Sequence, residues 1–389
     1  MKQRYYSLDV FRGATVALMI LVNNPGTWSN IFGPLKHAPW HGVTPTDLVF
    51  PFFLFAVGNA MAFVMPGLEA AGTSTFLTKV IRRTILIFGI GLFLNWWPFV
   101  QWREGDLIFK SWVDAQRSET GIRTLGVLQR IALCYCAAAL IVYFFKIRGA
   151  FVASAVLLLG YWALCILGNS QDPYSLEGWF GTAIDKKILG IPHMYKGEGV
   201  PFDPEGLMST LPAIVQVLFG YFVGNYIQQK GKTYEMLTNL FVAGAVLAFA
   251  GLCWGQLFPI NKKIWTSSYV LYTSGLAIII LSVFVHVIEF KERRGWWSRF
   301  FSAFGKNALF IFVLSGALPR LLGLIRWVDH TTQDGKPVYI SAFAWFYQHV
   351  CRPVSDNLKV GSLLYAICMI LFMYAIVWWL DRKKIYIRV

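Results

Sequence analysis

A short polar stretch at residues 36–42, Lys-His-Ala-Pro-Trp-His-Gly, separates two hydrophobic segments and contains a histidine that can act as a base. An imidazole binds and releases protons near neutral pH, which suits His37 to removing a proton from a nucleophile. Asp47, ten residues later, would orient this imidazole and stabilise its protonated form, as a carboxylate does in hydrolytic triads. The amide of Asn23 would hold a carbonyl oxygen or a developing oxyanion.

Each of these residues also has an ordinary structural interpretation. A histidine beside a membrane span can satisfy a backbone carbonyl or lie at the lipid interface, and Asn23 can cap a helix end. His37 and His41 have the i, i+4 spacing of zinc ligands on a helix, but Pro39 disfavours a helix there and no His-Glu-x-x-His pattern is present. The sequence therefore predicts no metal site.

The composition is that of a membrane protein. Of 389 residues, 56% are hydrophobic and 14% are charged, which is too apolar for a soluble globular chain. A net charge of +15 would suggest nucleic acid binding in a soluble chain, but helical membrane proteins collect Lys and Arg in cytoplasmic loops, so we exclude nucleic acid as a partner. The six cysteines lie in or near apolar segments, which indicates buried side chains rather than disulfides.

Apolar segments of about 20 residues predict ten transmembrane helices. They lie near residues 8–24, 46–66, 79–99, 124–145, 150–168, 209–229, 236–257, 266–288, 303–325 and 361–380. A shorter apolar stretch at 339–351 predicts an interfacial or re-entrant helix. The first segment resembles a signal peptide, but Asp9 and Arg12 interrupt it and no cleavage site follows, so we expect it to be retained. The predicted fold class is all-α and polytopic, with residues 1–389 forming one transmembrane domain.

The distribution of charge predicts the orientation. One face of the ten-helix arrangement collects seventeen Lys and Arg against five Asp and Glu, whereas the loops of the opposite face hold fifteen basic and fourteen acidic residues. The positive-inside rule makes the first face cytoplasmic. Both termini then lie in the cytoplasm, and His37 lies outside among long loops where a binding site can form.

Ionisable residues within apolar segments are costly and are therefore usually paired or functional. Arg12 either pairs with Asp9, three residues before it, or faces an anionic ligand at the cytoplasmic end. Arg130 has no acidic neighbour at helical spacing, so it either finds a structural partner on another helix or contributes to the active site.

Motifs distributed over the whole chain point to one family. They are Ser7–Gly13, Val22-Asn23, Lys36–Gly42, Asp47–Pro51, Gly126–Arg130, Phe202–Gly206, Pro259–Lys262, Trp265, Ser268-Tyr269 and Arg382–Ile385. In order and spacing they resemble the heparan-alpha-glucosaminide N-acetyltransferase family, the transmembrane acetyltransferases of lysosomes and their bacterial relatives.

The resemblance implies an acetyltransferase. In that family acetyl-CoA is supplied from the cytosol, and the acetyl group passes across the membrane to the amine of a terminal glucosamine. A histidine that corresponds to His37 is the catalytic residue, and the neighbouring amide corresponds to Asn23. We therefore expect His37, Asn23 and Asp47 to be catalytic and the acceptor to be an amino sugar.

Binding of coenzyme A requires positive charge for its phosphates. Arg12, Lys79 and Arg83 lie near the cytoplasmic ends of the first three predicted spans, although such residues also set topology. From the resemblance we add Arg130 and Ser268 as expected cofactor-binding residues. An extended pantetheine arm would reach much of the way through a bilayer towards His37.

The chain departs from the lysosomal members at three places. His41 stands where they have Asn, Ser315 replaces a histidine, and residues 326–360 form a longer stretch. The lysosomal enzymes also have an additional luminal region and one more span, so ten spans are expected for a minimal relative in a bacterial inner membrane. The family further suggests a homodimer.

Two mechanisms and two functions fit these residues. Acetyl transfer can be direct, or it can pass through an acetylated His37. The alternative function is an amino-sugar transporter in which His37 and Asp47 form a proton relay. Membrane lipid is the expected surrounding in both cases.

Overall fold

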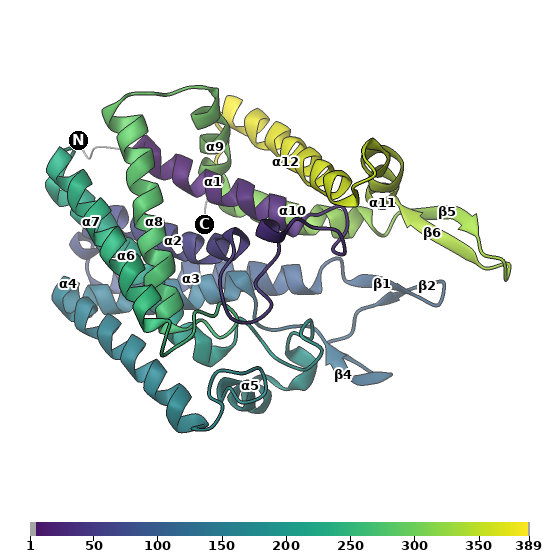
Figure 1. The fold of residues 1–389 in the computed structure, drawn as a ribbon, viewed down its shortest axis with the longest axis horizontal. Helices are drawn as coiled ribbons and strands as arrows, with labels where there is room; N and C mark the ends of the chain where they lie inside the picture. Colours follow the sequence, from purple (N-terminus) through teal and green to yellow (C-terminus); the bar gives the residue numbers. More distant parts are fainter. Residues whose placement is uncertain (1–4, 388–389) are drawn as a thin grey trace.

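The computed structural model describes residues 5–387 as a bundle of helices with short strands at one end. The helices are α1 (Tyr6–Asn23), α2 (Val49–Ala70), α3 (Thr73–Trp96), α4 (Val127–Gly168), α5 (Gly181–Leu189), α6 (Leu207–Lys230), α7 (Tyr234–Trp254), α8 (Ser267–Val285), α9 (Trp296–Lys306), α10 (Ala308–Leu322), α11 (Ala342–Phe346) and α12 (Leu358–Arg382). Figure 1 shows the strands at the right of the bundle, which we call the hairpin end. The start of α1 lies at the left, and we call that end the N-terminal end.

Seven helices in the described part of the chain are long and apolar enough to cross a membrane: α1, α2 with the turn before it, α4, α6, α7, α8 and α12. α9 and α10 are long and apolar enough to cross a membrane only when they are taken together, and they meet at an angle of 80°. If this bent pair forms one span, the described part of the chain has up to eight spans. The predicted count of ten is therefore not confirmed.

The predicted and observed numbers of spans differ because of local features in α4, in α3 and between α9 and α10. α4 contains 42 residues and covers two of the predicted segments. The backbone leaves helical geometry at Lys146 (φ 56°, ψ −172°), where the chain turns back, so the two segments are the two arms of α4. α3 contains Lys79, Arg82 and Arg83, and it is not among the seven. The predicted span at 303–325 is broken between α9 and α10.

Close backbone contacts hold α2 against α6. A Cβ atom added at Gly58 would lie 1.8 Å from the carbonyl oxygen of Val217, and one at Gly220 would lie 2.0 Å from the carbonyl oxygen of Phe55. Glycine at both positions lets the two helices approach each other as small residues do in membrane bundles. This contact fixes α2, which begins at Val49, two residues after Asp47.

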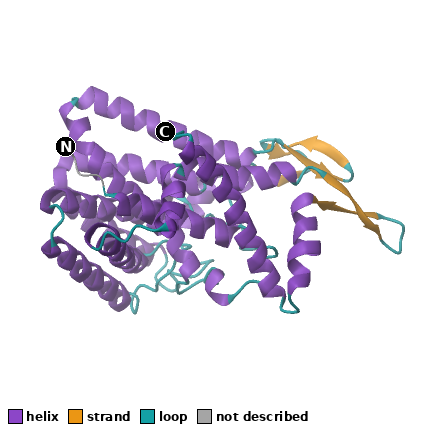
Figure 2. Cartoon of the chain, turned by 90° about the horizontal axis from the view of Figure 1, so that it is seen from above, coloured by secondary structure: helices purple, strands orange, loops and turns teal. Residues whose placement is uncertain are grey.

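The chain is mostly helical, as predicted, but the hairpin end also contains short strands that the all-α prediction did not include. Three two-stranded antiparallel sheets lie there: β1 (Val100–Arg103) with β2 (Asp106–Phe109), β3 (Val113–Asp114) with β4 (Arg117–Gly121), and β5 (Arg326–Thr331) with β6 (Pro337–Ser341). Two of them project from the helical body in Figure 2. Glu104 and Gly105 have positive φ angles of 51° and 98°, as a tight two-residue hairpin turn requires.

The predicted helix at 339–351 is partly correct. Its first residues belong to β6, and the helical part begins at α11, where the Ser341 hydroxyl accepts a hydrogen bond from the Ala344 amide (3.5 Å). A π-helical turn, Tyr347–Cys351, follows directly.

Candidate active site

His37 and Asp47 form a hydrogen-bonded pair in the loop between α1 and α2. His37 Nδ1 lies 2.6 Å from Asp47 Oδ1, and the exposed fraction of the side chain is 44% for His37 but only 1% for Asp47. An ionised carboxylate has no proton to donate, so Nδ1 donates and Nε2 is the nitrogen that can accept a proton. The pair therefore has the geometry of a base and its orienting carboxylate.

The loop itself fixes Asp47. Its Oδ2 accepts hydrogen bonds from the backbone amides of Ala38 and Thr44 (3.0 Å each), and the Tyr269 hydroxyl donates to its carbonyl oxygen (2.6 Å). Thr44 begins a 3₁₀ turn, Pro45–Leu48, with a capping box in which Asp47 is the acidic partner. This Thr-Pro-x-Asp signal was present in the sequence, and it explains why the carboxylate is preorganised.

A second loop, between α7 and α8, clamps the His37 loop. The Gly42 amide donates to the Ile260 carbonyl (2.7 Å), and Lys263 Nζ donates to the Pro39 carbonyl (2.6 Å). Lys262 Nζ lies 3.0 Å from His37 Nδ1. In the sequence, this loop contributed only to the family resemblance, and no catalytic role was predicted for Lys262 or Lys263.

Lys262 brings a positive charge to the pair. Its Nζ lies 3.4 Å from Asp47 Oδ1, and its side chain is mostly buried. Burial lowers the pKa of Lys262 below its ordinary value, although the carboxylates of Asp47 and Glu205 act in the opposite direction. The site thus contains three ionisable groups within contact distance of one another.

Arg130 lies behind the pair rather than in contact with it. It is buried, and its Nη2 donates to the Gly206 carbonyl (3.1 Å) and to the Ser209 hydroxyl. Its guanidinium lies 5.1 Å from the ring centroid of Trp265, which packs edge to face on Tyr269. The structure therefore gives Arg130 partners on another helix, and these partners are a carbonyl and a hydroxyl.

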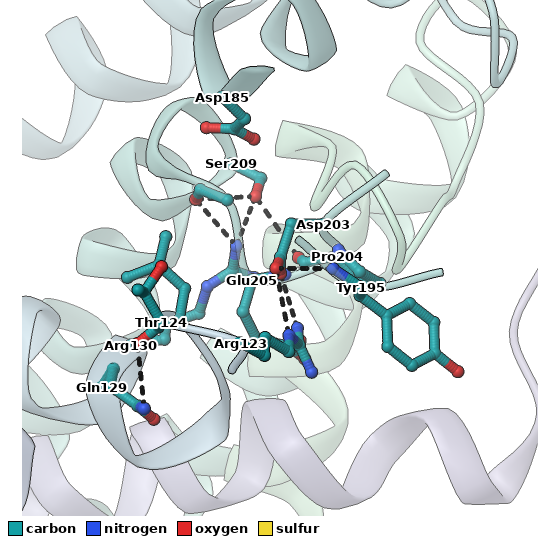
Figure 3. Close-up of polar contacts among 12 residues, drawn as sticks. Arg123, Thr124, Gln129, Arg130, Asp185, Tyr195, Asp203, Pro204, Glu205 and Ser209 are labelled. Carbon is teal, nitrogen blue, oxygen red and sulfur yellow. Dashed lines mark hydrogen bonds and ion pairs between the residues drawn. The ribbon is translucent and has the colours of Figure 1, made fainter. Parts of the chain in front are cut away.

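An ion-pair network lies beside Arg130 (Figure 3). Arg123 pairs with both Asp203 (3.0 Å from Nε) and Glu205. Burial alone would raise the pKa of Glu205, but the charge of Arg123 holds it below its ordinary value. Asp185 lacks such a partner, and burial raises its pKa to about 6. Since Glu205 also acts electrostatically on Lys262, this network extends to the His37 site.

Asn23 lies in a pocket of about 440 Å³ at the hairpin end. We call this pocket the hairpin pocket. Its polar lining is rich in amides and consists of Asn23, Asn24, Asn95, Arg123, Gln129, Ser315 and Arg320, and Trp28 also lines it. His37 and Asp47 are not among its lining residues, so the structure does not bring Asn23 into contact with the pair. Arg123 belongs both to this pocket and to the ion-pair network.

Arg12 and Arg83 share a second pocket, of about 350 Å³, at the N-terminal end. Lys306 also lines it, and we call it the N-terminal pocket. Arg12 lies 3.7 Å from Asp9 and donates to the Gly305 carbonyl (3.3 Å), whereas the Arg83 guanidinium stacks 4.7 Å from the Tyr135 ring centroid.

The two pockets approach each other inside the bundle. Leu128 and Phe312 line both of them. A layer that contains these two side chains therefore lies between a basic pocket at one end of the bundle and an amide-rich pocket at the other.

The remaining predicted cofactor residues lie elsewhere. Lys79 is exposed on α3 and lines neither pocket. Ser268 is buried at the start of α8, where its hydroxyl donates to the Phe258 carbonyl and so shapes the loop that clamps His37. Within residues 5–387, no three His, Cys, Asp or Glu side chains gather as metal ligands would.

Comparison with known proteins identifies a protein family that this chain matches. The family described as "Heparan-alpha-glucosaminide N-acetyltransferase, catalytic" matches residues 4–253. Heparan-alpha-glucosaminide N-acetyltransferase of Homo sapiens is 25% identical over 364 residues, which cover 80% of this chain and 52% of that protein. The Mus musculus protein of the same name is 25% identical over 365 residues, with 80% and 53% covered.

The chain spans about half the length of the curated relatives that it matches. The matched residues 4–253 include His37, Asp47, Asn23 and Arg130, whereas Lys262 lies beyond them. With most of its length matched by the family, the chain belongs to the heparan-alpha-glucosaminide N-acetyltransferase catalytic family.

Proposed function

We propose that this protein is a transmembrane acetyltransferase that transfers the acetyl group of acetyl-CoA to the amine of an amino sugar, with His37 as the catalytic base. The observation that carries the proposal is the contact of His37 Nδ1 with Asp47 at 2.6 Å in a chain of this family. Acyl transfer to an amine requires a base that takes the amine proton, and Nε2 of His37 supplies one.

The donor would bind in the N-terminal pocket. Arg12, Arg83 and Lys306 provide three cations for the phosphates of coenzyme A, and the rest of the lining is largely apolar, which suits an uncharged pantetheine arm. The arm would pass the layer of Leu128 and Phe312 and bring the thioester to the hairpin pocket. Because His37 does not line this pocket, the proposal requires the bound substrates to extend from the pocket to the His37 loop.

The direct reaction uses these groups in one step. The amine nitrogen attacks the thioester carbonyl, His37 Nε2 takes the amine proton, and the C–S bond breaks with its electron pair on sulfur. The imidazolium then returns the proton to the thiolate. The amide of Asn23, in the hairpin pocket, would donate a hydrogen bond to the carbonyl oxygen as its negative charge develops.

A two-step route forms acetyl-His37 before the sugar amine attacks. Mass spectrometry of the His37 peptide after incubation with acetyl-CoA alone distinguishes the two routes, because only the two-step route leaves an acetylated histidine.

Orientation and assembly belong to the same proposal. The excess of basic residues at the N-terminal end favours the cytoplasm for that end, so acetyl-CoA would enter from the cytosol and the acceptor would bind outside. We further propose a homodimer in a bacterial inner membrane, which rests on the family resemblance.

His37→Ala is expected to reduce acetyl transfer to glucosamine by about a hundredfold or more, since the base is lost. Acetyl-CoA binding, measured by isothermal titration calorimetry, is expected to stay near wild type, because the basic pocket lies at the other end of the bundle. His330→Ala is the matched control, since it removes an exposed His–Asp pair with a 2.9 Å contact on β5. Wild-type turnover in His37→Ala would refute the proposal.

A further inference from the structure

Lys262 contacts both members of the His37–Asp47 pair. Its Nζ lies 3.0 Å from His37 Nδ1 and 3.4 Å from Asp47 Oδ1, and the same Oδ1 lies 2.6 Å from Nδ1. One carboxylate oxygen is therefore shared by an ammonium and an imidazole. If the imidazole is also protonated, two cations lie within contact distance of a single anion.

Other charged groups near this cluster are engaged with different partners. Lys263 contacts Glu198 and the Pro39 carbonyl, and Glu205 pairs with Arg123. Lys36 precedes His37 on its loop, and His41 contacts Asn261 and is influenced by Asp172. The Tyr269 hydroxyl donates to the Asp47 carbonyl. Within residues 5–387, Lys262 is the cation that touches both His37 and Asp47.

Like charges at this distance oppose each other, and burial reduces the screening by water. The ammonium of Lys262 therefore favours the ionised state of Asp47 and disfavours the protonated state of His37. Removal of this ammonium leaves Asp47 as the dominant charge beside the imidazole, so protonated His37 becomes easier to form.

We propose that Lys262 is a positioning residue of this site: its ammonium holds the Asp47 carboxylate against His37 and keeps the imidazole neutral, ready to accept a proton. The proposal deepens the acetyltransferase function and rests on it for its purpose, because acetyl transfer requires a neutral base. Its physical content, the effect of Lys262 on the charge of His37, does not depend on any enzymatic activity.

The test measures the protonation of His37 directly. Diethyl pyrocarbonate modifies neutral imidazoles, and His37 is accessible with 44% of its side chain exposed. The modification rate of the His37 peptide, followed by mass spectrometry across pH in purified full-length protein, gives the pH of half-maximal rate. We expect Lys262→Met to raise this midpoint by about one pH unit, and Lys262→Arg, which keeps the charge, to leave it within a few tenths of a unit.

Two controls lie in the same chain. His330, paired with Asp329 on β5, is an internal reference whose midpoint stays constant in every variant. Lys263→Met removes the neighbouring lysine of the same loop, which contacts the Pro39 carbonyl and not the imidazole, and is expected to move the His37 midpoint less than Lys262→Met does. If Lys262→Met does not give a monodisperse protein, Lys262→Gln takes its place with the same expectation.

Equal His37 midpoints in wild type and in the charge-removing variant would overturn the proposal, and so would an equal shift in Lys263→Met. Acetyl transfer is measured in parallel on the same samples. If Lys262→Met shifts the His37 midpoint but the wild-type protein transfers no acetyl group, the proposed function alone is refuted. If the wild-type protein transfers acetyl groups and Lys262→Met leaves the midpoint unmoved, the role of Lys262 alone is refuted.

Discussion

A single carboxylate organises the residues around His37. Asp47 uses Oδ1 for the imidazole, Oδ2 for two backbone amides and its carbonyl oxygen for the Tyr269 hydroxyl. A hydrogen bond to Nδ1 fixes the tautomer and the ring orientation of a histidine base, so the proposed catalytic role of His37 depends on this neighbour.

Asp47→Asn is expected to reduce turnover by about 10²- to 10⁴-fold, because a neutral amide neither stabilises the imidazolium nor enforces the tautomer with the proton on Nδ1. Steady-state kinetics with acetyl-CoA and glucosamine measure the effect. Asp329→Asn disrupts the other His–Asp contact, at 2.9 Å on an exposed strand, and is expected to leave turnover unchanged. Full activity in Asp47→Asn would reduce its role to holding the loop.

The sequence led to part of this site. His37 and Asp47 are ten residues apart in one loop, so their chemistry and proximity suggested the contact that the structure contains. Lys262 is 225 residues from His37, and a contact between two distant loops leaves no local pattern in the chain. For Arg130, spacing indicated a partner on another helix but not that the partner would be the Ser209 hydroxyl.

At the scale of elements, the packing of α2 determines where Asp47 lies. α2 begins at Val49 and contacts α6 through Gly58 and Gly220 without space for a side chain. A displacement of α2 would therefore move the 3₁₀ turn that contains Asp47.

Gly220→Ala is expected to lower the stability by about 1–3 kcal/mol, because its Cβ would lie 2.0 Å from the Phe55 carbonyl oxygen and force the helices apart. Thermal unfolding in detergent, followed by tryptophan fluorescence, measures the change. Gly89→Ala on α3 is the matched control: its Cβ would meet nothing within 4 Å, and alanine favours helix. Equal unfolding temperatures of the two variants would contradict this account of the contact.

Hydropathy located the helical segments because apolar length is a strong signal, and it failed where geometry changes within a segment. The 80° bend between α9 and α10 lies inside the predicted segment 303–325. The reversal at Lys146, in contrast, lies between the predicted segments 124–145 and 150–168, where the sequence placed a connection. The strands β1 and β2 contain four residues each, too short for alternation to stand out among the aromatic residues near them in the sequence.

At the scale of the whole molecule, the two pockets support passage of an acetyl group through the bundle. In proteoliposomes with acetyl-CoA outside and glucosamine trapped inside, acetylated glucosamine is expected to form inside, because donor and acceptor would enter from opposite ends. Product that forms only when both substrates share one side would contradict a transmembrane reaction. Uptake of labelled N-acetylglucosamine without acetyl-CoA would favour the transporter alternative.

The layer of Leu128 and Phe312 between the two pockets has an electrical consequence. If water fills both pockets, most of the membrane voltage falls across this layer, where each elementary charge that crosses would gain or lose about 2.3 kcal/mol per 100 mV. The phosphates would stay with Arg12, Arg83 and Lys306, and only the uncharged arm and the acetyl group would cross. Acetyl export would then be electrically silent, so an energised membrane would neither drive nor resist it.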